Sequence, residues 1–561
     1  MTEFYTPKQA CRFPVLNPFD PSILKFIQHP PPLKCSRLQP ELTYAKKNKV
    51  YLEETLAFKH ELTKLQYQYF RRANGSDSSI FYNPWKSFPS SGELSLSHWS
   101  GVVLKGTYNK TFSYSNIYAS IEPLYDRSKD KEDVQAEGYR PNVVIIGIDS
   151  VSRSNVIRNL PLTYKYLTQE IGGWDMRGYV KIDDNTFPNM VAVLTGHKAT
   201  VQKSEFKLKP QFEFVDEWPF IWKNLSNIGY TTMLAEEQPG IFSYKAPGFK
   251  KQPTDVYLRS YESIERFMEN QNSLNKPYFV FSFLWKLSHD ITYEIEKLDE
   301  ILVTWLEKIH KKELLKNTLL FITSDHGNRF DKIRSTLIGR YEERMPFLFM
   351  RPPEEMLNRF PTIENALTTN LYRMSCHYDF YETLIDIVKG EYGNVKRPRF
   401  KDRGYSLFSE IPSTRTCKDV QIEEHFCVCQ EETSLSINDP LVQRSAKAIL
   451  EQINESLNPV NERCLSVQNN NRYHYAQLLT DKNVTNIISF VRVTLQTTPN
   501  NGVFEGVVQV TQASSTNSKI IAAITGYDNI SRINTYGKAA NCISLTHRYL
   551  EKFCTCREAG F

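Results

Sequence analysis

Apolar runs alternate with amphipathic stretches through the middle of the chain. The run Val143–Ile148 is apolar almost throughout, which is typical of a strand buried on both faces of a sheet. Three later runs predict strands on the same grounds: Tyr278–Leu284, Thr318–Thr323 and Pro346–Met350. Helical spacing predicts helices between them: Pro161–Glu170, Phe187–Thr195 and Lys297–Lys311. Buried strands alternating with helices indicate an α/β fold with a doubly wound, mostly parallel sheet.

The first 139 residues follow a different pattern, with many proline and aromatic residues. Leu and Tyr recur at helical spacing from Tyr44 to Phe70 and predict a helix there. The charged run Asp126–Asp133 then marks a domain boundary. We expect residues 1–139 to form an N-terminal extension that packs on a core formed by residues 140–410.

Beyond about residue 410, cysteines and polar turns become frequent. Residues alternate in Val491–Gln496 and Val503–Val510, on either side of Pro499–Gly502, which predicts a hairpin. We expect residues 411–561 to form a small, disulfide-rich α+β domain. It carries no catalytic motif.

Length and charge narrow the class of protein. The 561 residues exceed what one hydrophobic core usually supports, so two or three domains are expected. The net charge is only +6, with Lys and Arg spread among Asp and Glu, which gives no support for nucleic-acid binding. No apolar run approaches the roughly 20 residues of a membrane-spanning helix. We expect no membrane segment in this chain, and an anchor upstream of Met1 in the native protein stays open.

The ten cysteines are even in number and gather late in the chain. Such clustering favours disulfides, and hence a secreted protein or one in the lumen of the secretory pathway. Zinc is the alternative for Cys427-Val428-Cys429 and Cys554-Thr555-Cys556, although structural zinc sites usually space their cysteines about two to four residues apart. Six sequons are compatible with glycosylation on that route: Asn74, Asn109, Asn224, Asn454, Asn483 and Asn529.

Two of the predicted strands lead to side chains that bind divalent cations. One strand is followed at once by Asp149, and another leads to Asp325 and His326. Oxygen and nitrogen ligands on rigid elements, with Gly327 allowing close approach, suit such a cation. For each residue alone a plainer role is open, because Asp149 could cap a helix and His326 could be a hydrogen-bonded histidine.

A hydroxyl group lies between these two strand ends. Asp183-Asp184-Asn185-Thr186 leads into the predicted helix Phe187–Thr195. Free N–H groups and the dipole at a helix N-terminus favour an anion such as phosphate. A hydroxyl there that also touches a metal loses its proton readily and can act as a nucleophile. The alternative is that Thr186 only caps the helix.

Three motifs in this order resemble the alkaline phosphatase superfamily, particularly its nucleotide-phosphodiesterase and sulfatase-like branches. They are Gly147-Ile148-Asp149-Ser150, Asn185-Thr186-Phe187-Pro188-Asn189 with Leu194-Thr195-Gly196, and Ser324-Asp325-His326-Gly327. The chain is more similar still to an animal family described only as a domain of unknown function, DUF229. Further stretches carry that similarity: Thr186-Phe187-Pro188-Asn189, Ser288-His289-Asp290, Tyr341–Phe347 and Glu424–Cys429.

The resemblance implies a metal site in an alkaline-phosphatase-like core. Asp149, Asp325 and His326 would hold a divalent metal, with zinc first and manganese as the alternative. Thr186 would be both a further ligand and the catalytic nucleophile. Sulfatases of this superfamily need a Cys or Ser in a Cys/Ser-x-Pro-x-Arg motif, which this chain lacks after Thr186. Phosphoryl transfer therefore fits better than sulfate-ester hydrolysis.

A second metal is left open by the same resemblance. Candidates for a second metal or for substrate contact are Glu237, His289, Asp290 and His377. Related sequences place a histidine where this chain has Tyr381, and tyrosine is a poor zinc ligand in such a site. One site is therefore expected. Candidates for contact with phosphate are Asn189, Arg153 and Arg329. For the two arginines, a surface or structural role is the alternative.

The expected function is the hydrolysis or transfer of phosphate esters by attack of Thr186. The partner would be a phosphate-ester substrate or another anionic ligand, and a protein partner is open. The alternative is a non-catalytic extracellular binding protein or partner subunit that retains the fold. Tyr381 is the feature of the sequence that favours this alternative.

Overall fold

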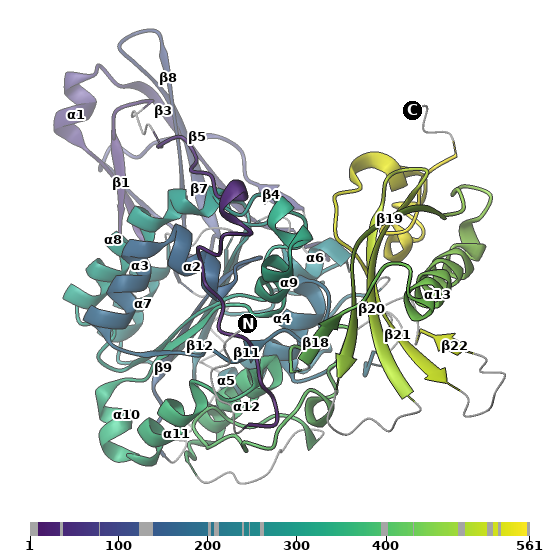
Figure 1. The fold of residues 1–561 in the computed structure, drawn as a ribbon. Coiled ribbons are helices and arrows are strands. Elements are labelled where there is room, and N and C mark those ends of the chain that lie inside the picture. Colours follow the sequence, from purple (N-terminus) through teal and green to yellow (C-terminus); the bar gives the residue numbers. More distant parts are fainter. Residues whose placement is uncertain are drawn as a thin grey trace.

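Figure 1 shows the fold of the computed structural model, coloured along the sequence. The structure describes residues 9–33, 38–73, 75–77, 79–122, 138–199, 204–206, 213–237, 240–245, 247–258, 263–393, 402–429, 431–480, 488–512, 520–524 and 529–557. The charged run Asp126–Asp133 lies outside these residues. Within them, every helix is too short or too polar to cross a membrane.

A seven-stranded sheet lies at the centre of the molecule. Its parallel strands are, in order, β15 (Thr318–Thr323), β9 (Asn142–Ile148), β14 (Tyr278–Leu284), β12 (Thr231–Glu236) and β13 (Val256–Leu258). Beyond β15, the sheet continues with β16 (Leu348–Arg351) and β10 (Trp174–Asp175), each antiparallel to its neighbour. The prediction of a mostly parallel sheet is confirmed.

Helices cover both faces of this sheet. Successive residues of a strand point to opposite faces, so alternate residues belong to different layers of the core. Val143 and Ile145 of β9 face one layer of the core, and Val144 and Ile146 face the other. The first layer contains residues of α4 (Thr186–Thr195), α5 (Ile221–Asn227), α6 (Ile241–Lys245), α10 (Glu354–Arg359), α11 (Thr362–Asn370) and α12 (His377–Lys389). The second contains residues of α2 (Arg153–Asn159), the π-helix Tyr166–Ile171, α7 (Ser263–Ser273) and α8 (Asp299–Lys311), with α3 (Pro161–Lys165) beside them. The sheet is therefore doubly wound, as predicted.

The N-terminal part is built from antiparallel strands, and the helix predicted from Tyr44 to Phe70 is wrong. One sheet contains β3 (Thr63–Arg72), β4 (Ile80–Tyr82), β5 (Lys86–Ser87), β7 (Gly101–Tyr108) and β8 (Phe112–Ala119), and another contains β1 (Thr43–Lys46), β2 (Lys49–Leu52) and β6 (Glu93–Ser95). Only Glu54–Lys59 is helical, as α1. Leu65, Tyr67 and Tyr69 alternate along β3 and pack between the two sheets, so a two-residue period is present beneath the helical spacing.

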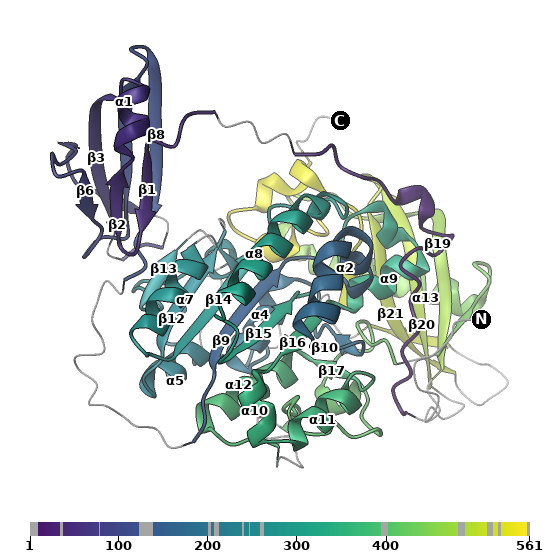
Figure 2. The same cartoon turned by 90° about the vertical axis from the view of Figure 1, so that its left-hand side faces the viewer.

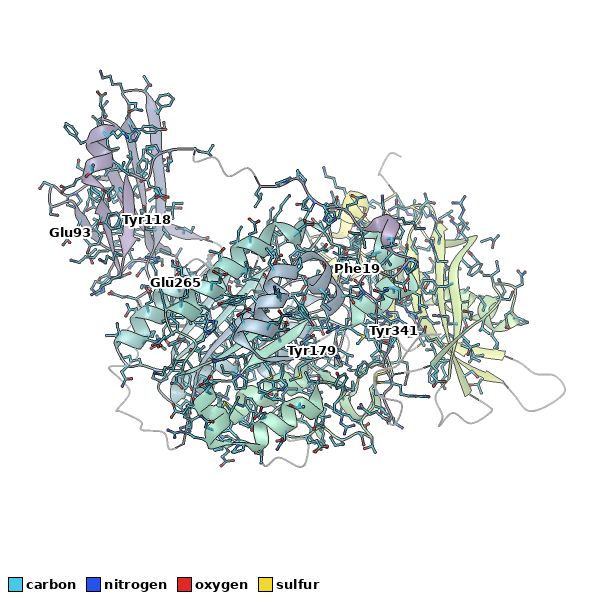
Figure 3. All side chains as sticks on the ribbon, turned by 60° about the vertical axis from the view of Figure 1, so that its left-hand side comes forward. Phe19, Glu93, Tyr118, Tyr179, Glu265 and Tyr341 are labelled. Atoms are coloured by element: carbon cyan, nitrogen blue, oxygen red, sulfur yellow. A yellow bond between two sulfur atoms is a disulfide. The ribbon has the colours of Figure 1, made fainter. Side chains whose placement is uncertain are left out.

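These N-terminal sheets project from the rest of the molecule (Figures 2 and 3). In Figure 3, Glu93 and Tyr118 lie in the projecting part, whereas Tyr179 lies in the core. The two parts touch where Arg72 donates to the carbonyl of Lys250 and Arg266 donates to the carbonyl of Ala119, at 3.2 and 3.1 Å. These sheets therefore contact the core near β13 and α7.

The C-terminal part is a further antiparallel sheet with one long helix. Its strands are β18 (Glu431–Ser434), β19 (Gln468–Thr480), β20 (Ile488–Thr498), β21 (Val503–Gln512), β22 (Ile520–Ala523) and β23 (Ile530–Arg532). Helix α13 (Pro440–Ser456) packs on one face of this sheet. The predicted hairpin is confirmed as β20 and β21, paired antiparallel.

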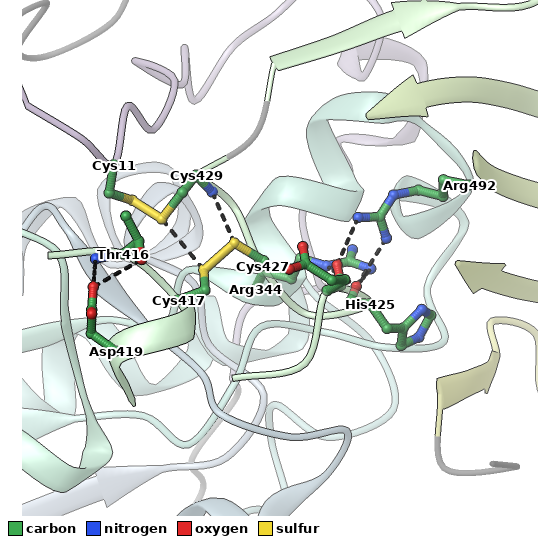
Figure 4. The surroundings of a disulfide bond; sticks show 10 residues. Cys11, Arg344, Thr416, Cys417, Asp419, His425, Cys427, Cys429 and Arg492 are labelled. Carbon is green, nitrogen blue, oxygen red and sulfur yellow. Dashed lines mark hydrogen bonds between the residues drawn. A yellow bond between two sulfur atoms is a disulfide. The ribbon is translucent and has the colours of Figure 1, made fainter. Parts of the chain in front are cut away.

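Disulfides fasten this part of the molecule, as the clustered cysteines predict. The described residues contain the pairs Cys11–Cys429, Cys417–Cys427, Cys464–Cys554 and Cys542–Cys556. The bond from Cys11 to Cys429 ties the N-terminal segment to a residue 418 positions away (Figure 4). Both Cys-x-Cys motifs thus form disulfides. Cys376 is free and buried, and Cys35 lies outside the described residues.

Candidate metal and phosphate site

The parallel pairing of β9 and β15 brings Asp149 and Asp325 together at the carboxyl ends of the two strands. The backbone N–H of Ser150 donates to Asp325 Oδ1 at 2.9 Å, and the Ser150 hydroxyl donates to Asp149 Oδ1 at 2.7 Å. Ser150 holds this position with φ at 62°. A serine in the left-handed region is strained, and such strain is common where a backbone is positioned for function.

Four polar side chains converge at this point. The ligand atoms of Asp149, Asp325 and His326 all lie within 4.8 Å of one another, and all three residues are buried. Thr186 is the first residue of α4, and its hydroxyl lies 3.3 Å from Asp149 Oδ2 and 3.4 Å from His326 Nε2. The structure therefore brings together the four residues that the sequence nominates.

Two carboxylates buried side by side are electrostatically unfavourable unless a positive charge lies close to them. Burial and then repulsion by Asp325 raise the pKa of Asp149. Burial also raises the pKa of Asp325, but the hydrogen bonds from the backbone N–H groups of Ser150 and His326 favour the ionised form, and the pKa is lowered. The pKa of His326 is lowered by burial. The imidazole is therefore neutral at pH 7 and offers a lone pair as well as a donor.

The arrangement of donors and acceptors fits a cation. His326 Nδ1 lies 2.8 Å from the carbonyl oxygen of Gly327, so we assign the proton to Nδ1. The lone pair of Nε2 then faces Asp325 Oδ2 at 3.1 Å, and no donor among the described residues reaches this buried oxygen. Two acceptors facing each other in a buried site repel unless a cation lies between them. Carboxylate oxygen, imidazole nitrogen and hydroxyl oxygen are ligands that zinc and manganese accept.

The loop before Thr186 is held by Asn189, a fully buried residue of α4. Its Oδ1 accepts from the N–H of Ile182 at 2.9 Å, and its Nδ2 donates to the carbonyls of Asp183 and Asn185 at 2.9 and 3.0 Å. The amide therefore shapes the loop that presents Thr186. The Asn185 side chain accepts from the N–H of Phe187 and caps the helix.

The two arginines nominated for phosphate contact have carboxylate partners. Arg329 donates to Asp184 Oδ2 at 2.7 Å, and Asp184 comes two residues before Thr186 in the chain. Arg153 donates to Asp175 at 2.7 Å and to the Tyr164 hydroxyl at 3.1 Å. Arg329 thus lies in the loops around the cluster, whereas Arg153 braces β10.

The nominated second-metal residues lie outside the cluster. Glu237 Oε2 accepts from the N–H groups of Trp285 and Lys286, each at 2.8 Å, and so closes the turn after β14. His289 Nδ1 lies 2.7 Å from Asp290 Oδ1 in a partly exposed pair. Among the described residues, the other metal-like groups are cysteine trios that form disulfides.

His377, another of these candidates, is fully buried at the start of α12, and its ring packs against Tyr179 with the centroids 4.9 Å apart and the planes tilted by 38°. Burial lowers its pKa to about 3, so the imidazole is neutral. Tyr381 lies one turn further along α12 and is buried in the apolar layer with Phe380. The position of Tyr381 is thus part of the core.

Three further residues around the site could not be predicted from the sequence. Lys181 is fully buried, pairs with Glu343 and donates to the carbonyl of Asp184 at 3.3 Å. Ser531 of β23 donates to Asp184 Oδ1 at 2.9 Å. His425, within the stretch Glu424–Cys429, lies 2.9 Å from Ser531 through its Nε2. Contacts between residues hundreds of positions apart leave no periodic signal in the sequence.

Solved structures with a similar fold are distant in sequence. The lipoteichoic acid synthase LtaP from Listeria monocytogenes is 10% identical, with 76% of this chain and 96% of that chain covered and a TM-score of 0.34. A protein in the alkaline phosphatase superfamily from Vibrio parahaemolyticus is 15% identical, with 75% and 89% covered and a TM-score of 0.32. The C-terminal periplasmic domain of EcEptC from Escherichia coli, in complex with Zn, is 13% identical, with 46% and 84% covered and a TM-score of 0.33. Similarities this weak carry no inference about activity.

Family membership rests on the sequence itself. No curated protein matches the chain. A family model described as protein of unknown function (DUF229) matches residues 30–272 and 260–472, which together make up most of the chain. The chain therefore belongs to the DUF229 family.

Proposed function

We propose that this protein is a metal-dependent hydrolase or transferase of phosphate esters with Thr186 as its nucleophile. Asp149, Asp325 and His326, together with Thr186, would hold one divalent cation, with zinc first and manganese second. The observation that carries the proposal is the convergence of these four side chains in a buried site rich in acceptors.

The surroundings of Thr186 support this role. A bound divalent cation would neutralise phosphate charge and lower the pKa of a nearby hydroxyl. The Thr186 hydroxyl lies 3.3 Å from Asp149 Oδ2, so this carboxylate is within reach of the hydroxyl proton. The N-terminus of α4 offers backbone N–H groups and a positive helix dipole to phosphate oxygens.

The proposed reaction has two steps. Thr186 Oγ1 forms a bond to phosphorus as the bond from phosphorus to the ester oxygen breaks, and the leaving oxygen takes up a proton. Water or a second alcohol then attacks phosphorus, the bond to Thr186 breaks, and the hydroxyl is restored. Water as acceptor makes the protein a hydrolase, and an alcohol makes it a transferase.

The setting of the reaction is also a proposal. The disulfides support an oxidising compartment, either the extracellular space or the secretory lumen. His289 and Asp290 lie beside the loop after His326, because Asn328 donates to the carbonyl of His289 at 3.1 Å. This position supports a contact with substrate more than a second metal site.

Comparison of Thr186 variants tests the function. Thr186→Ala should lower turnover of bis(4-nitrophenyl) phosphate by about a thousandfold or more, because the nucleophile is lost. Thr186→Ser keeps a hydroxyl and should retain measurable turnover. The matched control is Thr195→Val at the other end of α4, where the hydroxyl bonds only within its own helix and the next turn. Full turnover by Thr186→Ala would refute the assignment.

The alternative function is a non-catalytic extracellular binding protein, and the burial of Tyr381 in the core is the observation that favours it. Its signature would be a wild-type protein that binds no cation and turns over neither phosphomonoesters nor phosphodiesters. A wild-type protein with stoichiometric zinc and turnover that depends on Thr186 would exclude it.

A further inference from the structure

Asp184 joins three separate parts of the molecule. Its carboxylate accepts from Arg329, three residues beyond His326, at 2.7 Å and from Ser531 of the C-terminal sheet at 2.9 Å. The residue is buried. Arg329 forms an ion pair with this carboxylate, and Lys181 donates to the carbonyl of the same residue at 3.3 Å. Hydrogen bonds to a buried charged group are stronger than neutral ones.

The hydroxyl of Ser531 is oriented by His425. His425 Nε2 lies 2.9 Å from Ser531 Oγ, and burial lowers the pKa of His425, so the imidazole is neutral. The Ser531 hydroxyl donates to Asp184, which leaves its oxygen to accept from His425 Nε2–H. The carbonyl of His425 accepts in turn from Arg344 at 2.8 Å and Arg492 at 2.9 Å (Figure 4). A continuous chain of hydrogen bonds thus runs from the C-terminal sheet to Asp184.

The loop 183–185 is therefore fixed on two sides. Asn189 holds its backbone from within the core. The carboxylate of Asp184 holds it to the C-terminal sheet and to the loop that follows His326. Thr186 comes directly after this loop, so its position relative to His326 depends on both anchors.

We propose that Ser531, oriented by His425, is a positioning residue for the Thr186 site, so that the C-terminal sheet is a working part of this site. The inference rests on the function proposed above and extends it. Asp184 transmits the position of Ser531 to Thr186. A substrate phosphate would then meet a nucleophile whose place is set by a residue 345 positions further along the chain.

Two variants of Ser531 and one control test this role in the full-length protein. Ser531→Ala removes the link to Asp184, and Ser531→Thr keeps a hydroxyl. The control is Ser445→Ala, which removes an equally buried hydroxyl from α13 of the same part of the chain. The measurements are hydrogen exchange of the amides of residues 183–190, zinc content, and kcat and KM for bis(4-nitrophenyl) phosphate.

Ser531→Ala should speed exchange of these amides and lower kcat, each by about tenfold, because one charge-assisted hydrogen bond is lost. KM and zinc content should stay unchanged, Ser531→Thr should behave as wild type, and Ser445→Ala should change neither exchange nor kcat. Exchange and kcat in Ser531→Ala that match the control would overturn the proposal. If the wild type shows no turnover, the proposed function fails, and the exchange of residues 183–190 still decides whether Ser531 positions the loop.

Discussion

The backbone N–H of Ser150 donates to Asp325 Oδ1 at 2.9 Å and so locks the carboxyl ends of β9 and β15 together. Ser150 also bonds Asp149 through its hydroxyl, at 2.7 Å. One strained residue therefore orients both carboxylates of the site. The orientation of both carboxylates therefore depends on the backbone conformation of Ser150.

Substitution of Ser150 should reveal this strain. Ser150→Val should lower the free energy of unfolding by about 1–3 kcal/mol, because a β-branched residue tolerates a positive φ poorly. Ser150→Gly should cost less, since glycine adopts this conformation freely. Denaturant unfolding of both variants, with Ser150→Ala to account for the lost hydroxyl, measures the difference. Equal stability of the Val and Gly variants would argue against strain at this position.

The pH dependence of the metal-free protein should report the raised pKa of Asp149. A carboxyl with a folded-state pKa above its unfolded value stabilises the protein at low pH, and this contribution is lost as pH rises through the folded pKa. Wild type and Asp149→Asn should therefore be similar near pH 4, and the wild type should become the less stable of the two as pH rises. Chemical unfolding of both proteins from about pH 4 to pH 8, after treatment with a chelator, gives this comparison.

Zinc should reverse the order of stability of wild type and Asp149→Asn. Wild type gains stability because the cation binds the folded state, whereas Asp149→Asn has lost a ligand and should gain little. If the stability difference between wild type and Asp149→Asn is independent of both pH and zinc, then Asp149 and Asp325 do not repel each other in the folded protein.

Glu505 should be essential for the junction between the core and the C-terminal sheet. Its buried carboxylate lies 2.6 Å from Arg344, 3.2 Å from Arg334 and 3.6 Å from Arg492. Glu505→Gln should cost about 3–5 kcal/mol of unfolding free energy, because buried guanidinium groups lose their partner. The control Glu451→Gln breaks an exposed pair with Lys447 and should change stability by no more than about 0.5 kcal/mol.

Acid should weaken the same junction. These arginines lower the pKa of Glu505 by more than burial raises it, so its contribution is present above the unfolded pKa and lost as pH falls towards the folded one. The stability gap between wild type and Glu505→Gln should therefore narrow in acid. A gap that widens in acid would contradict the ionised carboxylate.

The sequons should differ in glycosylation when the protein is made in a secretory eukaryotic host. Asn109 is exposed at the tip of the β7–β8 hairpin and should carry a glycan. Asn454 bonds Val467 through both atoms of its amide, and Asn529 is buried, so neither should be modified. Glycopeptide mass spectrometry reads all three sites, with Asn109→Gln as the control. A glycan on Asn529 together with a bare Asn109 would contradict the structure.

Much of the core could be predicted because its signals are local. Strands that are apolar on both faces, such as Tyr278–Leu284, can be read directly from the sequence. The N-terminal sheets were missed because the helical spacing of Leu and Tyr over Tyr44–Phe70 obscures the two-residue alternation of Leu65, Tyr67 and Tyr69. The pairing strands that decide between helix and strand, such as β7, lie too far along the chain to be inferred from a local pattern.

The candidate site could likewise be predicted only in part. Asp149, Thr186, Asp325 and His326 could be nominated because each lies at the end of a predictable element. The contacts of Asp184 with Arg329 and Ser531 could not, since they depend on how the C-terminal sheet packs on the core. The structural roles of Asn189 and Arg153 likewise come from tertiary contacts. The domain limits at residues 139 and 410 stay predictions.

Location of the bound cation tests the central claim most directly. Crystals of the wild-type protein grown with zinc should give one anomalous peak at the zinc absorption edge, at about 2.0–2.2 Å from ligand atoms of Asp149, Thr186, Asp325 and His326. The peak should vanish in Asp325→Asn crystals of the same form. Wild-type crystals with no peak between these four side chains, or with zinc only at the His289 and Asp290 pair, would contradict the account.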